Sequence, residues 1–234
     1  MQKIRKNEDR GITQTYWLEG RHSFSFGEYH DPENMGFGPL RVINDDIVRA
    51  ESGFGMHGHK NMEIITYVLS GALEHKDSLG NGGIIRPGEV QVMSAGKGVL
   101  HSEFNPSKDE DVHLLQIWIM PRENGTRPTY NQKAFDPAEM QNRWRLIVSP
   151  DGEDGSISIL QDAHIYVTRL ADGAKTEIKL EADRKYWLHV ARGKIDIRGV
   201  ALSAGDALAL EKEQGKVDIK ASTDAEILFF DLPQ

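Results

Sequence analysis

The sequence predicts an all-β fold made of two similar β-barrels or sandwiches in tandem. Short alternating or β-branched runs recur along the chain at residues 40–43, 64–69 and 157–160, separated by Gly, Pro, Asp and Asn. Helical periodicity is weak throughout, and the two halves of the chain repeat one pattern of apolar residues and glycines. Many short strands with frequent turn signals are typical of a sandwich or a barrel, and the repeat indicates two of them.

The repeat consists of two pairs of matching segments. Residues 67–73 match residues 189–195 in their apolar positions and central glycine, and residues 86–90 match residues 203–207, where an acidic residue follows glycine. Each half therefore reads strand, glycine turn, strand, acidic glycine turn, strand. The alternative is that such short patterns recur by chance in an all-β protein.

A polar segment between the halves has the composition of a linker. It contains Asn124-Gly125, Pro128 and Asp136-Pro137, and residues 137–143 form the one stretch where we expect a helix. A chain of 234 residues is long enough for two compact domains of about a hundred residues each. We therefore expect an N-terminal barrel with a metal site at 1–134 and a C-terminal barrel without metal ligands at 135–234.

The composition excludes several classes of function. The net charge is -8 and no run of Lys and Arg is present, which argues against binding to nucleic acid. No cysteine is present, so neither a disulfide framework nor a thiolate ligand is available. Residues 1–11 lack the apolar stretch of a signal peptide, and the longest apolar run, 114–120, is too short to cross a bilayer. We expect a cytoplasmic protein without membrane contact.

The first candidate ligands are His57 and His59, which lie just before a strongly β-prone run. Residues two apart on a strand point to the same face, so both imidazoles are expected to converge. Gly55 and Gly58 reduce the side-chain bulk beside them and leave room for an ion.

A second pair, His101 and Glu103, has the same spacing and follows a glycine-rich turn. Together the pairs offer three neutral nitrogens and one carboxylate, a set that suits iron(II), manganese, cobalt, nickel, copper or zinc better than calcium or magnesium. The alternative is that each histidine is an isolated, hydrogen-bonded strand residue. Two matched pairs favour a metal site over that explanation.

Six segments in this order give the chain its resemblance to a known family. They are residues 22–26, 41–46, 53–63, 94–105, 115–119 and 230–233. In these segments the sequence resembles the bacterial pirins, which are bicupin proteins. The resemblance implies two tandem cupin barrels of the double-stranded β-helix, jelly-roll-like type. It also implies iron(II) in the N-terminal barrel, held by His57, His59, His101 and Glu103.

Other candidate residues receive lesser roles. Cupins in general use a glutamate four residues after the His-x-His pair, here Glu63, whereas the pirin pattern favours Glu103; we expect Glu63 to orient a ligand or a water. We expect structural roles for the remaining histidines, His22, His30, His75, His113, His164 and His189. The apolar residues near the site strands are expected to be barrel core and not substrate contacts; they are Phe26, Phe37, Phe54 and Met56.

The resemblance implies a function as well as a site. It is that of a quercetin 2,3-dioxygenase, which uses O2 to open the central ring of a flavonol and releases carbon monoxide. Glu103 would complete the metal site and take the proton of the flavonol hydroxyl. The alternative is a non-enzymatic iron protein whose oxidation state regulates a protein partner, and a substrate other than a flavonol is a third hypothesis. We expect a monomer, since two joined barrels already cover each other's packing surfaces.

Overall fold

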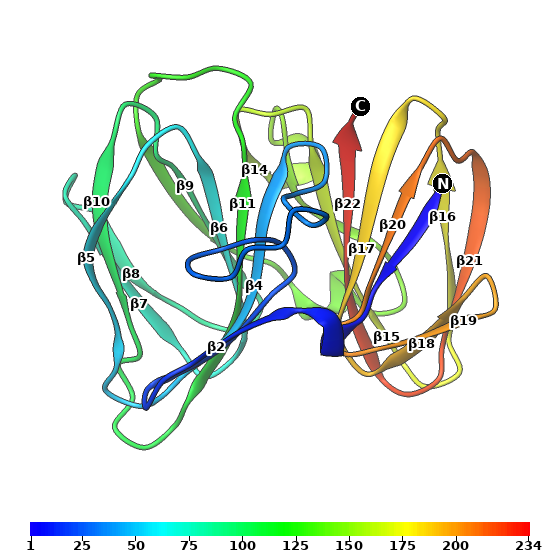
Figure 1. The fold of residues 1–234 in the computed structure, drawn as a ribbon, viewed down its shortest axis with the longest axis horizontal. Helices are drawn as coiled ribbons and strands as arrows, with labels where there is room; N and C mark the ends of the chain where they lie inside the picture. Colours follow the sequence, from blue (N-terminus) through cyan, green and yellow to red (C-terminus); the bar gives the residue numbers. More distant parts are fainter. The chain divides into compact units, whose positions relative to one another are not determined.

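The computed structural model describes residues 1–234, which form two compact units. The N-terminal unit comprises Gly11–Phe135 and Ile159–Gln161, and the C-terminal unit comprises Met1–Arg10, Asp136–Ser158 and Asp162–Gln234. Each unit contains one seven-stranded and one four-stranded sheet (Figure 1). The prediction of an all-β fold is confirmed.

The N-terminal unit is antiparallel throughout. In spatial order its larger sheet contains β12 (Thr129–Ala134), β9 (Glu89–Ser94), β6 (Glu63–Ser70), β11 (Val112–Ile119), β4 (Leu40–Val48), β3 (Leu18–His22) and β2 (Gly11–Gln14). Its smaller sheet contains β5 (Gly53–His59), β10 (Val99–Phe104), β7 (Leu73–Asp77) and β8 (Gly82–Ile85).

The C-terminal unit has a similar arrangement, except for one parallel pair of strands at the edge of its larger sheet. In spatial order its larger sheet contains β1 (Gln2–Arg5), β20 (Ala207–Glu211), β17 (Arg184–Arg192), β22 (Ala225–Pro233), β15 (His164–Leu170), β13 (Arg145–Ser149) and β14 (Ile157–Ser158). Its smaller sheet contains β16 (Lys175–Leu180), β21 (Gly215–Ala221), β18 (Lys194–Ile197) and β19 (Val200–Ser203). The β5-β10-β7-β8 order of one unit thus corresponds to the β16-β21-β18-β19 order of the other.

The matching glycines confirm the repeat in backbone geometry. Gly71 and Gly193, each in the turn after the long strand, have φ of 75° and 77°, and Gly88 and Gly205 have φ of 88° and 85°. A Cβ at Gly71 would lie 2.6 Å from the Asp111 carbonyl oxygen, and a Cβ at Gly193 would lie 2.0 Å from the equivalent carbonyl in its own unit. Both turns therefore require glycine for conformation and for space.

The division into domains at 134/135 stays a prediction. Along the chain the units change between Phe135 and Asp136, but Met1–Arg10 belongs to the C-terminal unit and Ile159–Gln161 to the N-terminal one. Met1–Arg10 belongs to the C-terminal unit because β1 pairs with β20. β1 lies beside β20 at the edge of its sheet, as β12 lies beside β9 in the N-terminal unit.

The prediction of a helix at residues 137–143 is wrong, except for one turn at its start. Only a 3-10 turn, η2 (Pro137–Glu139), forms there, with the Asp136 carboxylate accepting from the Ala138 N–H at 2.9 Å. Asn142 has a φ of 55°, outside the helical region, so the chain cannot continue as a helix. The other helical elements are the 3-10 turns η1 (Asn7–Asp9) and η3 (Glu153–Gly155). No helix is long and apolar enough to span a membrane.

The interiors of the two units differ at one equivalent place. In the C-terminal unit, Ile178 and Leu180 of β16 and Val217 and Ile219 of β21 are buried in the hydrophobic core. In the N-terminal unit the corresponding strands β5 and β10 bring histidines and a glutamate inward instead. Polar chemistry is therefore concentrated in the interior of the N-terminal barrel.

Candidate metal centre

Two neighbouring strands position the four predicted ligands. His57 and His59 lie on β5 and are half-buried, whereas Met56, which precedes His57, and Gly58, which lies between the two histidines, are exposed. His101 and Glu103 lie on β10 and are buried, with exposed fractions of 1% and 4%. The period of two along each strand thus turns all four side chains inward. His101 pairs directly with His57 across the two strands.

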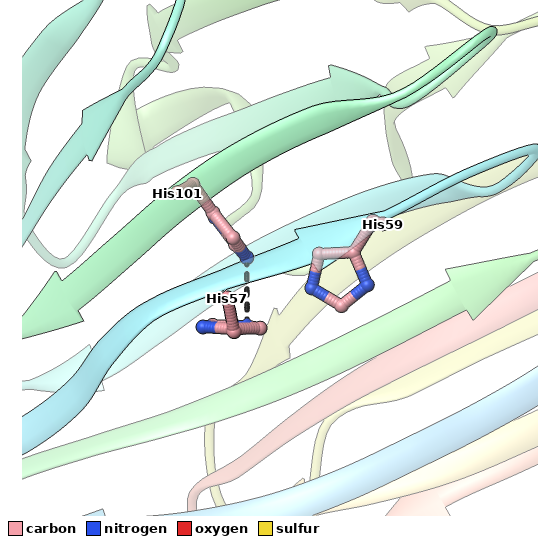
Figure 2. A group of neighbouring side chains, drawn as sticks. All are labelled: His57, His59 and His101. Carbon is pink, nitrogen blue, oxygen red and sulfur yellow. Dashed lines mark hydrogen bonds between the residues drawn. The ribbon is translucent and has the colours of Figure 1, made fainter.

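The three histidine rings converge (Figure 2). The Nε2 atoms of His57 and His101 are 3.0 Å apart, and the ring centroid of His59 lies 4.8 Å from that of His57 and 4.7 Å from that of His101. One nitrogen from each ring can be chosen so that all three lie within 4.8 Å of one another. Such a cluster has the donors and the spacing of a metal site.

The backbone sets the tautomer of His57. Its Nδ1 is 2.8 Å from the carbonyl oxygen of Gly55, which can only accept, so Nδ1 carries the proton and donates it. The Nε2 atom is then left with its lone pair, directed at the cluster. A ligand histidine whose other nitrogen donates to a carbonyl is a regular feature of protein metal sites.

Burial keeps the other two rings neutral. It lowers the pKa of His59 to about 4, and the neighbouring His57 contributes to the same shift. Burial also lowers the pKa of His101 to about 2, with further contributions from His57 and His59. Neutral imidazoles are the ligating form, so at neutral pH both rings are prepared to bind a cation without first losing a proton.

Glu103 lies deeper than the three histidines. Burial raises the pKa of its carboxyl group, although hydrogen bonds from Gln116 oppose the shift. Nε2 of Gln116 lies 3.0 Å and 3.1 Å from the two carboxylate oxygens. Glu103 groups with His101 and His75, whose ligand atoms lie within 4.8 Å of one another. The structure thus gives two overlapping groups that share His101: one with His57 and His59, the other with His75 and Glu103.

The residues present fit a divalent metal ion. Three imidazole nitrogens and a buried carboxylate supply the mixed donor set that transition metals prefer. The buried carboxylate lacks a cationic side chain among its hydrogen-bond partners, which are the neutral Gln116 and Thr66. A buried carboxylate without a nearby countercharge is expensive, and a metal cation would supply that charge.

A cavity of about 250 Å³ opens onto this cluster. Its walls include His57, His59 and Glu103. Other parts of the wall are apolar or aromatic; they include Leu18, Phe26, Phe54, Leu73, Leu114 and Trp118. The Trp118 ring packs edge-on against Phe26 and against His59, with centroids 5.4 Å and 4.9 Å apart. A flat aromatic molecule suits such a lining.

The prediction that four apolar residues near the site are barrel core is confirmed for Phe54, which packs against a buried apolar cluster of this barrel, and is wrong for Met56. Phe54 and Phe26 also line the cavity, and Phe37 is partly buried. Met56 is 59% exposed because it alternates with the two histidines along β5, so its side chain points outward from the opposite face of the strand. A pattern of apolar residues does not distinguish a cavity wall from a filled core.

The carboxylate of Glu63 bonds none of the four predicted ligands. Its carboxylate accepts from the Ser94 hydroxyl at 2.6 Å and from the Leu160 N–H at 3.3 Å, and these partners are not metal-ligand candidates. Burial raises the pKa of this carboxyl group. Its hydrogen bonds therefore tie β6 to β9 and to the segment Ile159–Gln161.

The other histidines are distributed through both units. His22 bonds Asn44 and Thr13, each at 2.8 Å, His113 lies 2.6 Å from Asp45, and His164 lies 3.3 Å from Glu153. His30 is exposed and His189 is buried in the C-terminal unit. His75 differs from these, because it contacts the metal-ligand candidate His101, and the sequence analysis gave it no part in the site. The available signal was its spacing of two from the buried Leu73, which puts it on the inward face of β7.

Comparison with known proteins decides the family. Residues 4–119 match the Pirin family model, and residues 146–232 match the model of the quercetinase C-terminal cupin domain. A relative from Escherichia coli strain K12 named quercetin 2,3-dioxygenase is 47% identical over 230 residues, which is 98% of each chain. The chain belongs to the pirin family. The resemblance noted in the sequence is thus confirmed, and with it the two cupin barrels.

Solved structures of pirins agree with this assignment. The crystal structure of YhhW from Escherichia coli is 48% identical, with a TM-score of 0.95 over 100% of this pirin and 98% of that chain. A second structure, of the bacterial pirin YhhW in complex with nickel(II), is 47% identical, with a TM-score of 0.94 over 100% and 99% of the two chains. In this pirin, the groups of histidine and glutamate side chains described above could hold a metal ion.

Proposed function

We propose that this pirin is an iron(II)-dependent dioxygenase that opens the central ring of a flavonol such as quercetin with O2 and releases carbon monoxide. The observation that carries the proposal is the cluster of His57, His59 and His101, which faces an aromatic-walled cavity beside the buried carboxylate of Glu103. The names of the curated relatives and of the C-terminal family model support the same reaction.

In this proposal the three histidines and Glu103 hold the metal. Three neutral nitrogens and one carboxylate leave one or two positions of a five- or six-coordinate ion for other ligands. The bound metal supplies Lewis acidity toward the flavonol 3-oxygen and redox capacity toward dioxygen. Of the metals that suit this donor set, iron(II) is the one we propose, with manganese, cobalt, nickel, copper and zinc as the competing candidates.

Glu103 is proposed to take the proton of the 3-hydroxyl. A carboxylate within hydrogen-bond reach can accept this proton, and Glu103 lines the cavity in which the hydroxyl would lie. Gln116 donates to both of its oxygens and so holds the carboxylate in one orientation. The proton would move to a carboxylate oxygen, and the flavonol would be left as its anion.

The cavity walls would orient the substrate and exclude water. Phe26, Phe54 and Trp118 offer ring faces and edges to a planar ligand, at a volume of about 250 Å³. Exclusion of water strengthens the electrostatic effect of the metal and of Glu103 on the substrate anion.

The experiment that tests this proposal follows two products at once. The protein is purified anaerobically, loaded with iron(II) and mixed with quercetin and O2, and quercetin loss and carbon monoxide release are measured together. We expect one carbon monoxide per quercetin consumed, at a rate above that of the same concentration of free iron(II). The His57→Ala variant should lose this rate, while His164→Ala, a histidine change in the C-terminal unit, should keep it. Turnover no greater than that of free iron would defeat the proposal.

A second candidate function is regulation of a protein partner by the oxidation state of the iron. One observation favours it: Met56, Leu100 and Phe104, on the strands that carry the histidines, are 59%, 50% and 39% exposed. Exposed apolar side chains that gather on one surface can mark a protein contact. Pull-downs with the iron(II) and iron(III) forms discriminate, because a regulator should retain a partner in only one of them and a pure enzyme in neither.

A further inference from the structure

We infer that Asn44 and Asp46 determine which flavonols the cavity binds, through hydrogen bonds to a ligand hydroxyl group other than the one at position 3. The Asn44 amide donates to the oxygen of this hydroxyl, and the Asp46 carboxylate accepts a hydrogen bond from it. The inference rests on the proposed function for its class of ligand and makes that class more specific, because the flavonol must carry a further hydroxyl group.

Both residues lie on the inward face of β4. They are two residues apart along the strand and share this face with Val48, which belongs to the apolar core of the barrel. Asn44 and Asp46 both line the cavity, and their exposed fractions are 3% and 4%. The wall beside them is apolar, since it includes Leu18 and Leu114. A buried polar pair in such a wall offers a ligand hydroxyl a defined place to bind.

The strand register places this pair beside the candidate metal centre. Asn44 lies opposite Gln116 in the pairing of β4 with β11, and Gln116 donates to both oxygens of Glu103. Gln116 and Glu103 line the same cavity as Asn44 and Asp46. A planar ligand with its 3-oxygen at the metal centre can therefore bring a second oxygen to β4.

Hydrogen bonds to β3 and β2 hold the Asn44 amide in one orientation. Its Oδ1 lies 2.8 Å from Nδ1 of His22, and Nε2 of His22 lies 2.8 Å from the Thr13 hydroxyl oxygen. An amide oxygen only accepts, so His22 donates through Nδ1 and accepts from Thr13 through Nε2. The oxygen of Asn44 is thus engaged with His22, whereas its NH2 group has no hydrogen-bond acceptor within the chain. This NH2 group is the donor that we assign to the ligand.

Burial makes the pair selective for a hydroxyl group. When a ligand covers the Asn44 amide, the N–H groups lose water, and this loss is recovered only if the ligand brings an acceptor. A hydroxyl group satisfies both residues, because its oxygen accepts from Asn44 and its hydrogen is donated to Asp46. A methoxy group can only accept, and a ring hydrogen can do neither. The pair therefore discriminates against flavonols that lack the hydroxyl at this place.

The first test compares ligands on the unmodified protein, both metal-free and loaded with zinc(II), which has no redox chemistry and allows no turnover. The ligands are quercetin, 3-hydroxyflavone, which keeps only the 3-hydroxyl, and the ethers of quercetin in which one other hydroxyl is methylated. Trp118 lines the cavity, so quenching of tryptophan fluorescence gives the dissociation constants. We expect 3-hydroxyflavone and one of the ethers to bind about 10- to 100-fold more weakly than quercetin. Equal binding of all these flavonols, or binding of none in either form of the protein, would overturn the inference.

The second test repeats these measurements on Asn44→Asp, which keeps an oxygen for His22 and removes the NH2 group. We expect quercetin binding to weaken about 10-fold or more and 3-hydroxyflavone binding to change little, so that the ratio of the two dissociation constants approaches one. A purely structural role of Asn44 would weaken both ligands alike, and an unchanged ratio would overturn the inference. The matched control is Asn131→Asp, at an exposed position of β12 in the same sheet, which should keep the ratio.

Asp46→Asn tests the acceptor. Its amide can donate where the carboxylate accepted, so we expect the sensitive ether to bind nearly as tightly as quercetin. An ether that bound as weakly to Asp46→Asn as to the unmodified protein would contradict the role of the carboxylate. The comparison of ligands on the unmodified protein decides the inference if the variants do not fold.

The outcomes separate this inference from the proposed function. If Asn44→Asp abolished the preference for quercetin but the iron(II)-loaded protein released no carbon monoxide, the proposed reaction would fail and the inference would stand. If carbon monoxide were released while folded Asn44→Asp kept the preference, the reaction would stand and the inference would be overturned.

Discussion

The Nε2 atoms of His57 and His101 lie 3.0 Å apart across the paired strands β5 and β10. The proton of His57 is on Nδ1, where it bonds the Gly55 carbonyl, so its Nε2 presents a lone pair to His101. That lone pair can accept the Nε2–H of His101, and a bound cation would take the place of this proton. The register between β5 and β10 therefore brings together two nitrogens that a metal ion could bind.

Replacement of Glu103 by glutamine should separate the metal site from the base. The Glu103→Gln variant keeps the size of the side chain but loses its charge and basicity. We expect weaker iron(II) binding and, in variant reloaded with iron, a rate of flavonol cleavage lower by about 10²- to 10⁴-fold, the usual contribution of a general base. Iron content and steady-state rate measure the two effects.

Glu63→Gln is the matched control for Glu103, because it changes the other buried glutamate of this barrel. Glu63 bonds Ser94 and Leu160, so the variant should keep its iron. If Glu63→Gln lost its iron and Glu103→Gln retained it, Glu63 and not Glu103 would be the carboxylate ligand, which would contradict the proposed site.

The repeated glycine turn should tolerate no side chain. Gly193→Ala would force a Cβ to within 2.0 Å of the Asp224 carbonyl oxygen at a φ of 77°. We expect a loss of about 2–4 kcal/mol in the free energy of unfolding, from left-handed strain together with overpacking. Gly173→Ala provides the control, since its φ is 76° and nothing lies within 4 Å of the added Cβ. That variant should lose only about 1 kcal/mol in denaturant unfolding, and equal losses would show that the close contact is unimportant.

Asp206 should make stability depend on pH in the acid range. Burial opposes ionisation of this carboxyl group, but hydrogen bonds from the Lys6 side chain and from the N–H groups of Ser203 and Asn7 outweigh it and lower its pKa. A carboxyl group with a lowered pKa in the folded state stabilises the fold above its unfolded pKa, near 3.9, and this contribution disappears as the pH falls through the folded pKa.

The test of this dependence compares unfolding of the unmodified protein with that of Asp206→Asn across the pH range. At neutral pH we expect the variant to be less stable by about 1.5–3 kcal/mol, and the difference should shrink below about pH 4. Asp218→Asn, at an exposed position of β21, should show little difference at any pH. A difference that stayed constant into the acid range would contradict the assigned role of the charge.

The sequence was most informative where local spacing determines which way side chains point. Alternation along β5 and β10 was enough to turn His57, His59, His101 and Glu103 inward, and glycines marked the equivalent turns of both barrels. It was least informative where the answer depends on pairing between distant strands. The position of β1 beside β20 joins residues about two hundred positions apart, and no local pattern specifies it.

The same limit explains why His75 was missed. Its inward direction follows from its spacing to Leu73, but its contact with His101 depends on the register between β7 and β10. The cavity was missed for a related reason, because Phe26 comes from a loop and Phe54 from β5, and only the folded barrel brings them to one wall.

The most direct test of the account is the iron content of the His101→Ala variant. The unmodified protein, the variant and a His164→Ala control are isolated without added metal, reloaded anaerobically with iron(II), desalted and subjected to elemental analysis. We predict close to one iron per chain in the unmodified protein and in His164→Ala, and almost none in folded His101→Ala. Iron in His101→Ala at the level of the unmodified protein would contradict the proposed site.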